Sequence, residues 1–315
     1  MSQVGPCRGP SNGRLIPEHF RPKAHLTARA TVNDESCEHP FSSFQDSTDF
    51  TDTTRSKSKL ASSHWLTRIQ GHCQRVIARS FARRPFEILA QAPLVSFTFD
   101  DFPRSALLTG GAILQSFGLA GTYYASFGLM GQQAPTGPIF LAEDLKLLFE
   151  QGHELGCHTF SHCHAWDTQP KAFEDSVVRN QQALNTLVPG TTFKTFSYPI
   201  SVPRAGTKRR ISKYFACCRS GGQNFNIGNV DLNHLSAFFL EKSRDKPEIV
   251  KELIDQNRRA RGWLILATHD ISKDPTRWGC TPDFFEEIVR HAVNSGAQVL
   301  PVLQAYETLR TGSSS

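Results

Sequence analysis

Short apolar runs alternate with amphipathic segments along the chain from residue 94 onward. The runs mix aliphatic, β-branched and aromatic residues, as strands buried on both faces do. We expect strands at 94–99, 121–126, 153–157, 194–199, 214–218, 234–239, 263–268 and 297–302. Helical periodicity predicts helices at 104–117, 141–151, 170–187, 247–260 and 281–295. This alternation predicts a parallel sheet covered by helices.

The segment at 281–295 shows the clearest helix boundaries. Thr281 is a good N-cap, Pro282 suits the first helical position, and Gly296 suits the residue after the end. Seven or eight strand and helix units follow one another between residues 94 and 303. We therefore predict an α/β fold, a distorted (β/α)7-8 barrel.

The chain before this pattern has a different composition. Residues 1–62 are rich in Ser, Thr and Asp and show no periodicity, so we expect a disordered N-terminal segment. Residues 63–93 form an amphipathic, Arg-containing lead-in, for which we favour a solvated helix over one packed on the domain's edge. The main folded domain is then expected at 94–310.

Composition narrows the class of protein. No apolar run reaches the roughly 18 residues of a membrane helix, so we expect no membrane span. The net charge of +6 arises partly from basic clusters near 83 and at 206–213. An anionic partner would suit them, but solvated surface charge is the favoured interpretation, and no nucleic-acid motif is present. Eight cysteines without disulfide spacing, and no recognisable signal peptide, favour a cytoplasmic location. The oligomeric state is not indicated.

Polar residues follow five of the predicted strands. They are "DD" at 100–101, "HTFSH" at 158–162, "YPIS" at 198–201, "CRSGG" at 218–222 and "THD" at 268–270. Because parallel strands of a barrel end at the same edge, these groups should meet at one mouth.

His158 and His162 stand four residues apart. On a helical turn both imidazoles would face one direction and share a cation, whereas the alternative is two surface histidines in a loop. Asp101 can add a carboxylate, which leaves coordination positions open, as a catalytic metal requires. Asp100 then stays free to accept a proton. The alternative for the Asp pair is a turn or a helix cap.

The order "TFDD" at 98–101, "HTFSH" at 158–162, "FSYPIS" at 196–201 and "THD" at 268–270 resembles the polysaccharide deacetylases with the NodB homology domain, carbohydrate esterase family 4. The resemblance covers roughly residues 94–303. It implies a distorted barrel and hydrolysis of acetyl groups from N- or O-acetylated sugars.

The resemblance also implies roles for single residues. Asp101, His158 and His162 would hold a divalent metal, most often Zn²⁺, with Co²⁺ or a similar ion as an alternative. Asp100 would be the general base and His269 the general acid.

The third motif departs from the family pattern. Its usual arginine is replaced by Ser197, so the base lacks its usual partner. We expect Arg219, which follows the fifth strand, to grip Asp100 through two parallel hydrogen bonds. Arg204 is the second candidate, and the alternative role of Arg219 is a surface or sugar contact. Phe102 replaces the glycine that usually follows the Asp pair and should narrow the groove.

We therefore predict a metal-dependent hydrolase that deacetylates an N-acetylated oligo- or polysaccharide, a hydrolase of carbon–nitrogen bonds other than peptide bonds. The alternatives are an O-acetyl esterase and a catalytically silent sugar-binding relative. Tyr198, Trp166 and Trp278 are candidates for stacking on sugar rings, with packing as the alternative. A backbone N–H near Ile200 is the candidate donor to the reaction's oxyanion.

Overall fold

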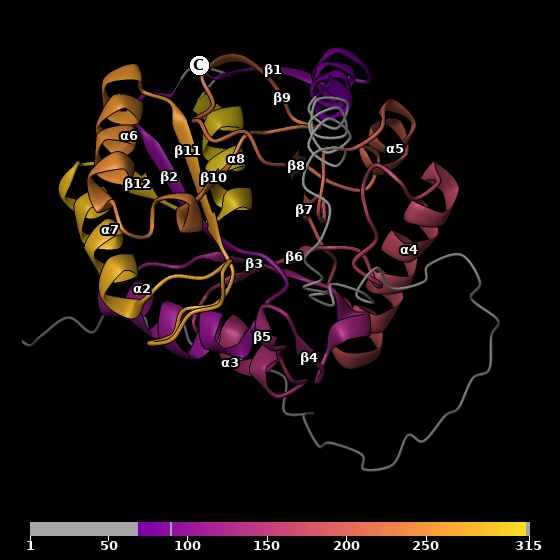
Figure 1. Ribbon diagram of the computed structural model, residues 1–315, viewed down its shortest axis with the longest axis horizontal. Helices are drawn as coiled ribbons and strands as arrows, with labels where there is room; N and C mark the ends of the chain where they lie inside the picture. The colour runs from indigo at the N-terminus through magenta and orange to yellow at the C-terminus, as the bar shows by residue number, and fades with distance from the viewer. Residues whose placement is uncertain (1–68, 89, 313–315) are drawn as a thin grey trace, which may run out of the picture. The chain divides into compact units, whose positions relative to one another are not determined.

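The computed structural model (Figure 1) describes residues 69–88 and 90–312. The segment predicted to be disordered, 1–62, and the first residues of the lead-in lie outside these ranges. Within them, no helix is both long and apolar enough to cross a membrane.

The centre of the molecule is an eight-stranded sheet in which every strand pairing is parallel. Its strands are β2 (Leu94–Phe99), β3 (Thr122–Ala125), β6 (Glu154–Cys157), β7 (Thr195–Ser197), β8 (Cys217–Arg219), β10 (Phe238–Phe239), β11 (Trp263–Thr268) and β12 (Gln298–Val299). They lie in the order β10-β11-β2-β3-β6-β7-β8, and β12 pairs with β2. All eight overlap the predicted strands, and β2 and β11 have the predicted bounds.

The two ends of this strand order are joined. Arg219 at the end of β8 forms a parallel bridge with Leu235, which leads into β10. The Leu235 N–H donates to the Cys218 carbonyl, and the Ser220 N–H donates to the Leu235 carbonyl, both at 2.9 Å. The sheet therefore curls into the predicted distorted barrel.

Helices surround the barrel, with α6 and α7 on one side and α4 and α5 on the other (Figure 1). The α-helices are α2 (Ala112–Ser116), α3 (Asp144–Glu150), α4 (Pro170–Leu187), α5 (Ala205–Ile211), α6 (Pro247–Ala260), α7 (Pro282–Asn294) and α8 (Val302–Gly312). A π-helix, η1 (Ala106–Gly111), precedes α2, and short 3-10 helices lie at η2 (Phe127–Leu129) and η3 (Leu240–Ser243). The five predicted helices are present, while α5 and α8 were not predicted.

Local sequence explains the boundaries of α7. The Thr281 hydroxyl accepts from the Phe284 N–H at 3.4 Å, as the N-cap prediction required. Gly296 has φ of +78°, a left-handed conformation that glycine adopts without strain. The apolar face of α7 packs on the sheet, with the rings of Phe97 and Phe285 5.4 Å apart. Burying each such ring contributes roughly 1.5–3 kcal/mol.

The lead-in contains the expected helix, which is mostly exposed and is attached to the barrel near its end. Residues 69–80 are helical, and we call them the lead-in helix. The chain then forms β1 (Pro85–Ile88), which pairs antiparallel with β9 (Gly228–Asp231). Ala78 and Ile88 are buried, so the lead-in packs against the barrel.

Candidate active site

The two aspartates follow β2 where the chain turns sharply. Asp101 and Phe102 both have left-handed backbones, with φ of +61° and +54°, a conformation that costs energy in residues other than glycine. The turn sends the Phe102 ring into the core, where it is fully buried and stacks on Phe140 with ring centroids 4.6 Å apart. Our expectation that Phe102 narrows the groove is therefore wrong.

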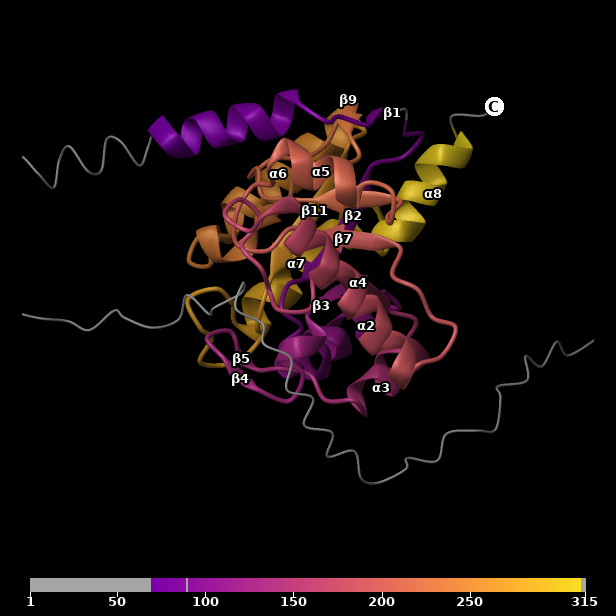
Figure 2. The same cartoon turned by 90° about the vertical axis from the view of Figure 1, so that its right-hand side faces the viewer.

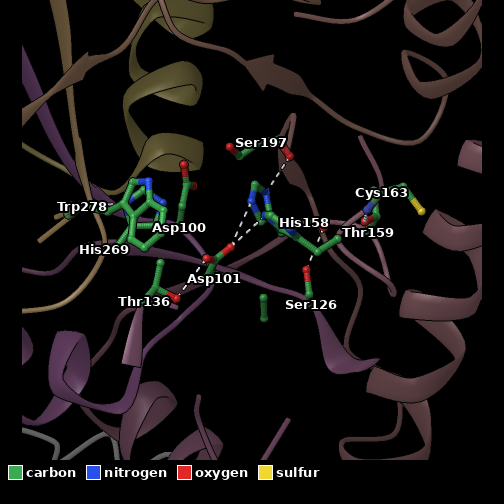
Figure 3. A network of polar contacts seen from close by, with 12 residues as sticks. Asp100, Asp101, Ser126, Thr136, His158, Thr159, Cys163, Ser197, His269 and Trp278 are labelled. Atoms are coloured by element: carbon green, nitrogen blue, oxygen red, sulfur yellow. Dashed lines mark hydrogen bonds and ion pairs between the residues drawn. The ribbon is translucent and has the colours of Figure 1, made fainter. Parts of the chain in front are cut away.

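Asp101, His158 and His162 come together at one point, and Figure 3 shows Asp101 and His158 beside each other. One ligand atom from each lies within 4.8 Å of the others. Asp101 Oδ1 is 3.5 Å from His158 Nε2 and 3.0 Å from His162 Nε2. Residues 158–162 form a loop rather than the helical turn we inferred from their spacing, and left-handed backbones at Thr159 and His162 direct the second ring.

Neighbouring groups fix the orientation of these side chains. His158 Nδ1 donates to the Ser197 carbonyl at 2.8 Å, which leaves Nε2 as the available lone pair. The Thr136 hydroxyl donates to Asp101 Oδ2 at 3.0 Å. Thr136 lies in the turn of a hairpin formed by β4 (Gln133–Ala134) and β5 (Gly137–Pro138). The structure thus shows a supporting shell that the motifs did not predict.

The protonation behaviour of the group suits a cation. Burial would raise the pKa of Asp101, but the charge and hydrogen bond of His162 outweigh it, so the pKa lies well below its ordinary value. Burial lowers the pKa of His158 to about 4, so this ring is neutral at neutral pH. Asp101 Oδ1 is buried, and the groups nearest to it are the two imidazole Nε2 atoms. Two imidazoles and one carboxylate fit a divalent ion such as zinc.

Asp100 is buried beside the group and contacts Arg219 (Asp100 Oδ1 and Arg219 Nη2). This is one hydrogen bond, not the two-pronged grip we expected. Burial would raise the pKa of Asp100, but the Arg219 charge, with smaller effects from His158 and His269, lowers it. Arg204 instead donates to the Asp167 carbonyl at 3.2 Å.

Two aromatic rings confine Arg219. Its guanidinium carbon lies 4.7 Å from the centre of the Tyr124 ring and 5.8 Å from that of Phe239. Arg219 is 1% exposed, so a role in surface contacts is excluded by its burial.

His269 follows β11 and faces the same site (Figure 3). Its Nδ1 lies 3.3 Å from the Trp278 carbonyl, so Nδ1–H donates there and Nε2 remains for chemistry. Asp270 does not orient this ring, because its carboxylate accepts from the N–H and hydroxyl of Thr276 at 2.9 and 2.5 Å. Asp270 therefore holds the loop.

One cavity of about 1140 Å³ is lined by the two aspartates and by His158, His162 and His269. Tyr198 and Ile200 line it, although the Tyr198 ring is buried and packs edge-on against Phe196 at 4.9 Å. Ile200 is 55% exposed. Trp166 lies outside the lining, whereas Trp278, also a candidate for stacking on a sugar ring, is part of it.

Glu241 is a lining residue that the motifs missed. Glu241 follows β10 and lies in η3. Its Oε2 is buried and has no hydrogen-bond partner among the described residues. Burial raises the pKa of this carboxyl. Its position at the end of a predicted strand was the available signal.

Residues 90–214 match the family model described as polysaccharide deacetylase. This match confirms the resemblance that the four motifs predicted. The matched range includes both aspartates and both histidines of the site and ends before Arg219 and His269. No curated protein matched the chain.

Several solved structures are similar to this chain. One is the CE4 domain of a multidomain xylanase from the hindgut metagenome of Trinervitermes trinervoides (17% identity, 69% of this chain and 91% of that chain, TM-score 0.49). A second is a CE4 family pseudoenzyme from Bacillus anthracis (10% identity, 69% and 66%, TM-score 0.49). A third is a family 4 carbohydrate esterase from Streptomyces lividans in complex with acetate (18% identity, 67% and 92%, TM-score 0.46).

Proposed function

We propose that this chain, with its polysaccharide deacetylase match, is a metal-dependent hydrolase that removes acetyl groups from an N-acetylated oligo- or polysaccharide. The observation that carries the proposal is the convergence of Asp100, the Asp101–His158–His162 group and His269 on one cavity. We assign the catalytic domain to residues 94–310. The cytoplasmic location stays a prediction.

Asp101, His158 and His162 would hold the divalent ion, with zinc as our first choice and cobalt as the second. When bound, such an ion supplies a Lewis acid for the acetyl carbonyl and makes a water nucleophile available near neutral pH. The neutral His158 ring and the ionised Asp101 carboxylate are in the protonation states that ligation needs.

Asp100 accepts the proton of the attacking water. Its carboxylate lines the cavity and is held ionised by Arg219, so it is present as a base. A positioned base of this kind contributes roughly 10²- to 10⁴-fold in rate.

His269 donates a proton from Nε2 to the departing amine nitrogen. An amine is a poor leaving group as an anion, so the carbon–nitrogen bond breaks only as the nitrogen gains a proton. The Trp278 carbonyl holds Nδ1 and so directs Nε2 toward the cavity. The backbone N–H of Ile200 is our candidate donor to the oxyanion, because its left-handed backbone lies on the cavity wall.

The test is acetate release from chitooligosaccharides, which carry N-acetyl groups, and from acetyl-xylan, which carries O-acetyl groups. We expect the wild-type protein to release acetate from the N-acetylated substrate. We expect Asp100→Asn to lose this activity. Release from acetyl-xylan alone would make the protein an O-acetyl esterase. Binding of sugars without release from either, at full metal content, would show a silent sugar-binding protein.

A further inference from the structure

The lead-in helix (residues 69–80) forms part of the wall of the catalytic cavity. Gly71, Gln74, Arg75 and Arg79 line the cavity together with the strand ends of the barrel. Figure 2 shows this helix in indigo, lying across the molecule near α5. The helix precedes residues 90–214, which match the family model. It therefore adds to the cavity a wall segment that lies outside the residues matched by the family model.

A buried lysine ties the carboxyl end of the helix to the barrel. Lys208 of α5 is fully buried, and its Nζ donates to the carbonyls of Ala78 and Phe81 at 2.6 and 2.9 Å. The same Nζ pairs with Asp231 Oδ2 at 2.6 Å. A cation is favourable here, because the last carbonyls of a helix lack partners within it.

The chain that follows is held as well. Arg84 donates from its guanidinium to four backbone carbonyls, those of Ser212, Phe215, Ala216 and Leu232. The β1–β9 pairing continues the attachment. The contacts of Lys208 and Arg84 and the β1–β9 pairing therefore hold the lead-in helix beside the cavity.

Four cationic side chains line the cavity, namely Arg75, Arg79, Lys242 and Arg277. Among the ion pairs of the described residues, none involves these four. In the basic cluster at 206–213, by contrast, Lys208 pairs with Asp231, and Arg210 and Lys213 pair with Glu174. The cavity wall therefore carries four cationic side chains that form no ion pair with the described residues.

Three carboxylates line the cavity, and only Glu241 forms no ion pair with the described residues, so it can offset at most one of the four positive charges. Asp100 is paired with Arg219, and Asp101 lies against the two histidine rings. At the rim, Arg277 places its guanidinium carbon 4.0 Å from the centre of the Trp278 ring. An aromatic face beside a cation offers a surface for a sugar ring and a partner for an anionic substituent.

We propose that the substrate is an anionic acetylated saccharide, and that Arg75 and Arg79 of the lead-in helix bind its negatively charged groups. The proposal rests on the proposed deacetylase function. Carboxylate and phosphate both match the planar guanidinium fork, so the ligand chemistry is an oxyanion carried on a sugar.

The test uses two matched pairs of acetylated oligosaccharides and the full chain. One pair is a xylo-oligosaccharide with and without glucuronate, and the other is a chitooligosaccharide with and without a 6-phosphate. We expect kcat/KM to favour the charged member of at least one pair, and the pair that shows it identifies the anion. In Arg75→Gln/Arg79→Gln this preference should fall about tenfold or more, since hydrogen bonds to charged groups contribute roughly 1.5–3 kcal/mol.

Arg83→Gln is the matched control. Arg83 lies in the same lead-in but lies outside the cavity lining and contacts exposed Asn229, so the preference should persist. Equal kcat/KM for charged and neutral members, or an unchanged preference in the double variant, would overturn the proposal while the deacetylase function stood. If no substrate released acetate, the proposed deacetylase function would be wrong. The affinities of the same charged and neutral oligosaccharides, measured by calorimetry in the wild type and in Arg75→Gln/Arg79→Gln, would then test whether the two arginines bind the anion.

Discussion

Arg219, the last residue of β8, contacts the carboxylate of Asp100, which follows β2, across 119 positions of sequence. Both side chains are buried, and the aromatic rings of Tyr124 and Phe239 flank the guanidinium. The third motif, which begins at Ser197, offers no arginine at this place. The contact that orients the proposed base therefore comes from β8, the strand beside β7, which carries the third motif.

Replacing Arg219 with lysine should lower turnover while leaving metal content unchanged. Lysine keeps the charge but not the planar guanidinium that lies between the two rings. We expect kcat to fall with little change in KM, because Arg219 positions Asp100 and has no proposed substrate contact. Added guanidinium should restore part of the turnover of Arg219→Ala but not that of Asp100→Asn. A change confined to KM would instead assign Arg219 to substrate binding.

The two adjacent aspartates should give different phenotypes. Asp100→Asn should keep the metal and lose about 10²- to 10⁴-fold in kcat, the contribution of a positioned base. Asp101→Asn should lose metal, because it removes the carboxylate from the three-residue group. Metal analysis beside steady-state kinetics separates the two, and exchanged phenotypes would reverse our assignment.

Removing the two imidazoles together should abolish metal binding without unfolding the chain. His158→Ala/His162→Ala deletes two of three proposed ligands, while the barrel strands around them stay unchanged. The wild-type protein should bind close to one divalent ion per chain. Metal content of the purified proteins and their circular dichroism spectra provide the check. Equal metal content in the two proteins would refute the site.

The barrel could be predicted from sequence because its strands are continuous apolar runs. All positions of β2 and β11 are buried, and the run "WLILAT" has one polar position, Thr268, which is β-branched and suits a strand. In contrast, α5 contains "GTKRR", whose lysine we interpreted as solvated. Lys208 is instead buried against a carboxylate and two carbonyls from distant segments, and local sequence contains no sign of them.

Site residues that are close in sequence could be predicted. Contacts between residues that are distant in sequence were harder to predict. The aspartate pair and the HxxxH spacing indicated which side chains meet, but not that His162 needs a left-handed backbone. Thr136 was missed because its contact with Asp101 depends on a hairpin turn from another part of the chain. Trp166 was selected as an aromatic residue near the motifs, yet its loop directs it elsewhere.

Stability should depend on pH through His153. This ring is 4% exposed, its Nδ1 accepts from the Gly121 N–H at 3.0 Å, and burial lowers its pKa to about 4. A group whose pKa is lower in the folded state stabilises the protein above the unfolded pKa of about 6.5, and that stability is lost as pH falls toward 4. Urea unfolding between pH 7 and about 4 should therefore show a shallower loss of stability in His153→Asn than in wild type. Equal slopes would contradict the assignment.

The anchor of the lead-in helix should be a large determinant of stability. Lys208→Met leaves Asp231 buried without its cation and the carbonyls of Ala78 and Phe81 without a donor. Breaking a buried pair in this way costs roughly 3–5 kcal/mol, which urea unfolding would detect. Lys146→Met, which removes a partner of Glu150 in an exposed pair on α3, is the control and should change little.

A second substitution separates charge from packing. Adding Asp231→Asn to Lys208→Met removes the stranded charge, while the Asn Oδ1 can still accept from the N–H groups of Arg84 and Asn233 that now bond Asp231 Oδ1. Part of the lost stability should return, because an uncompensated buried charge is the main cost of breaking the pair. If the double variant were less stable than Lys208→Met alone, the lysine would act chiefly through its bonds to the helix carbonyls, and the ion pair would be secondary.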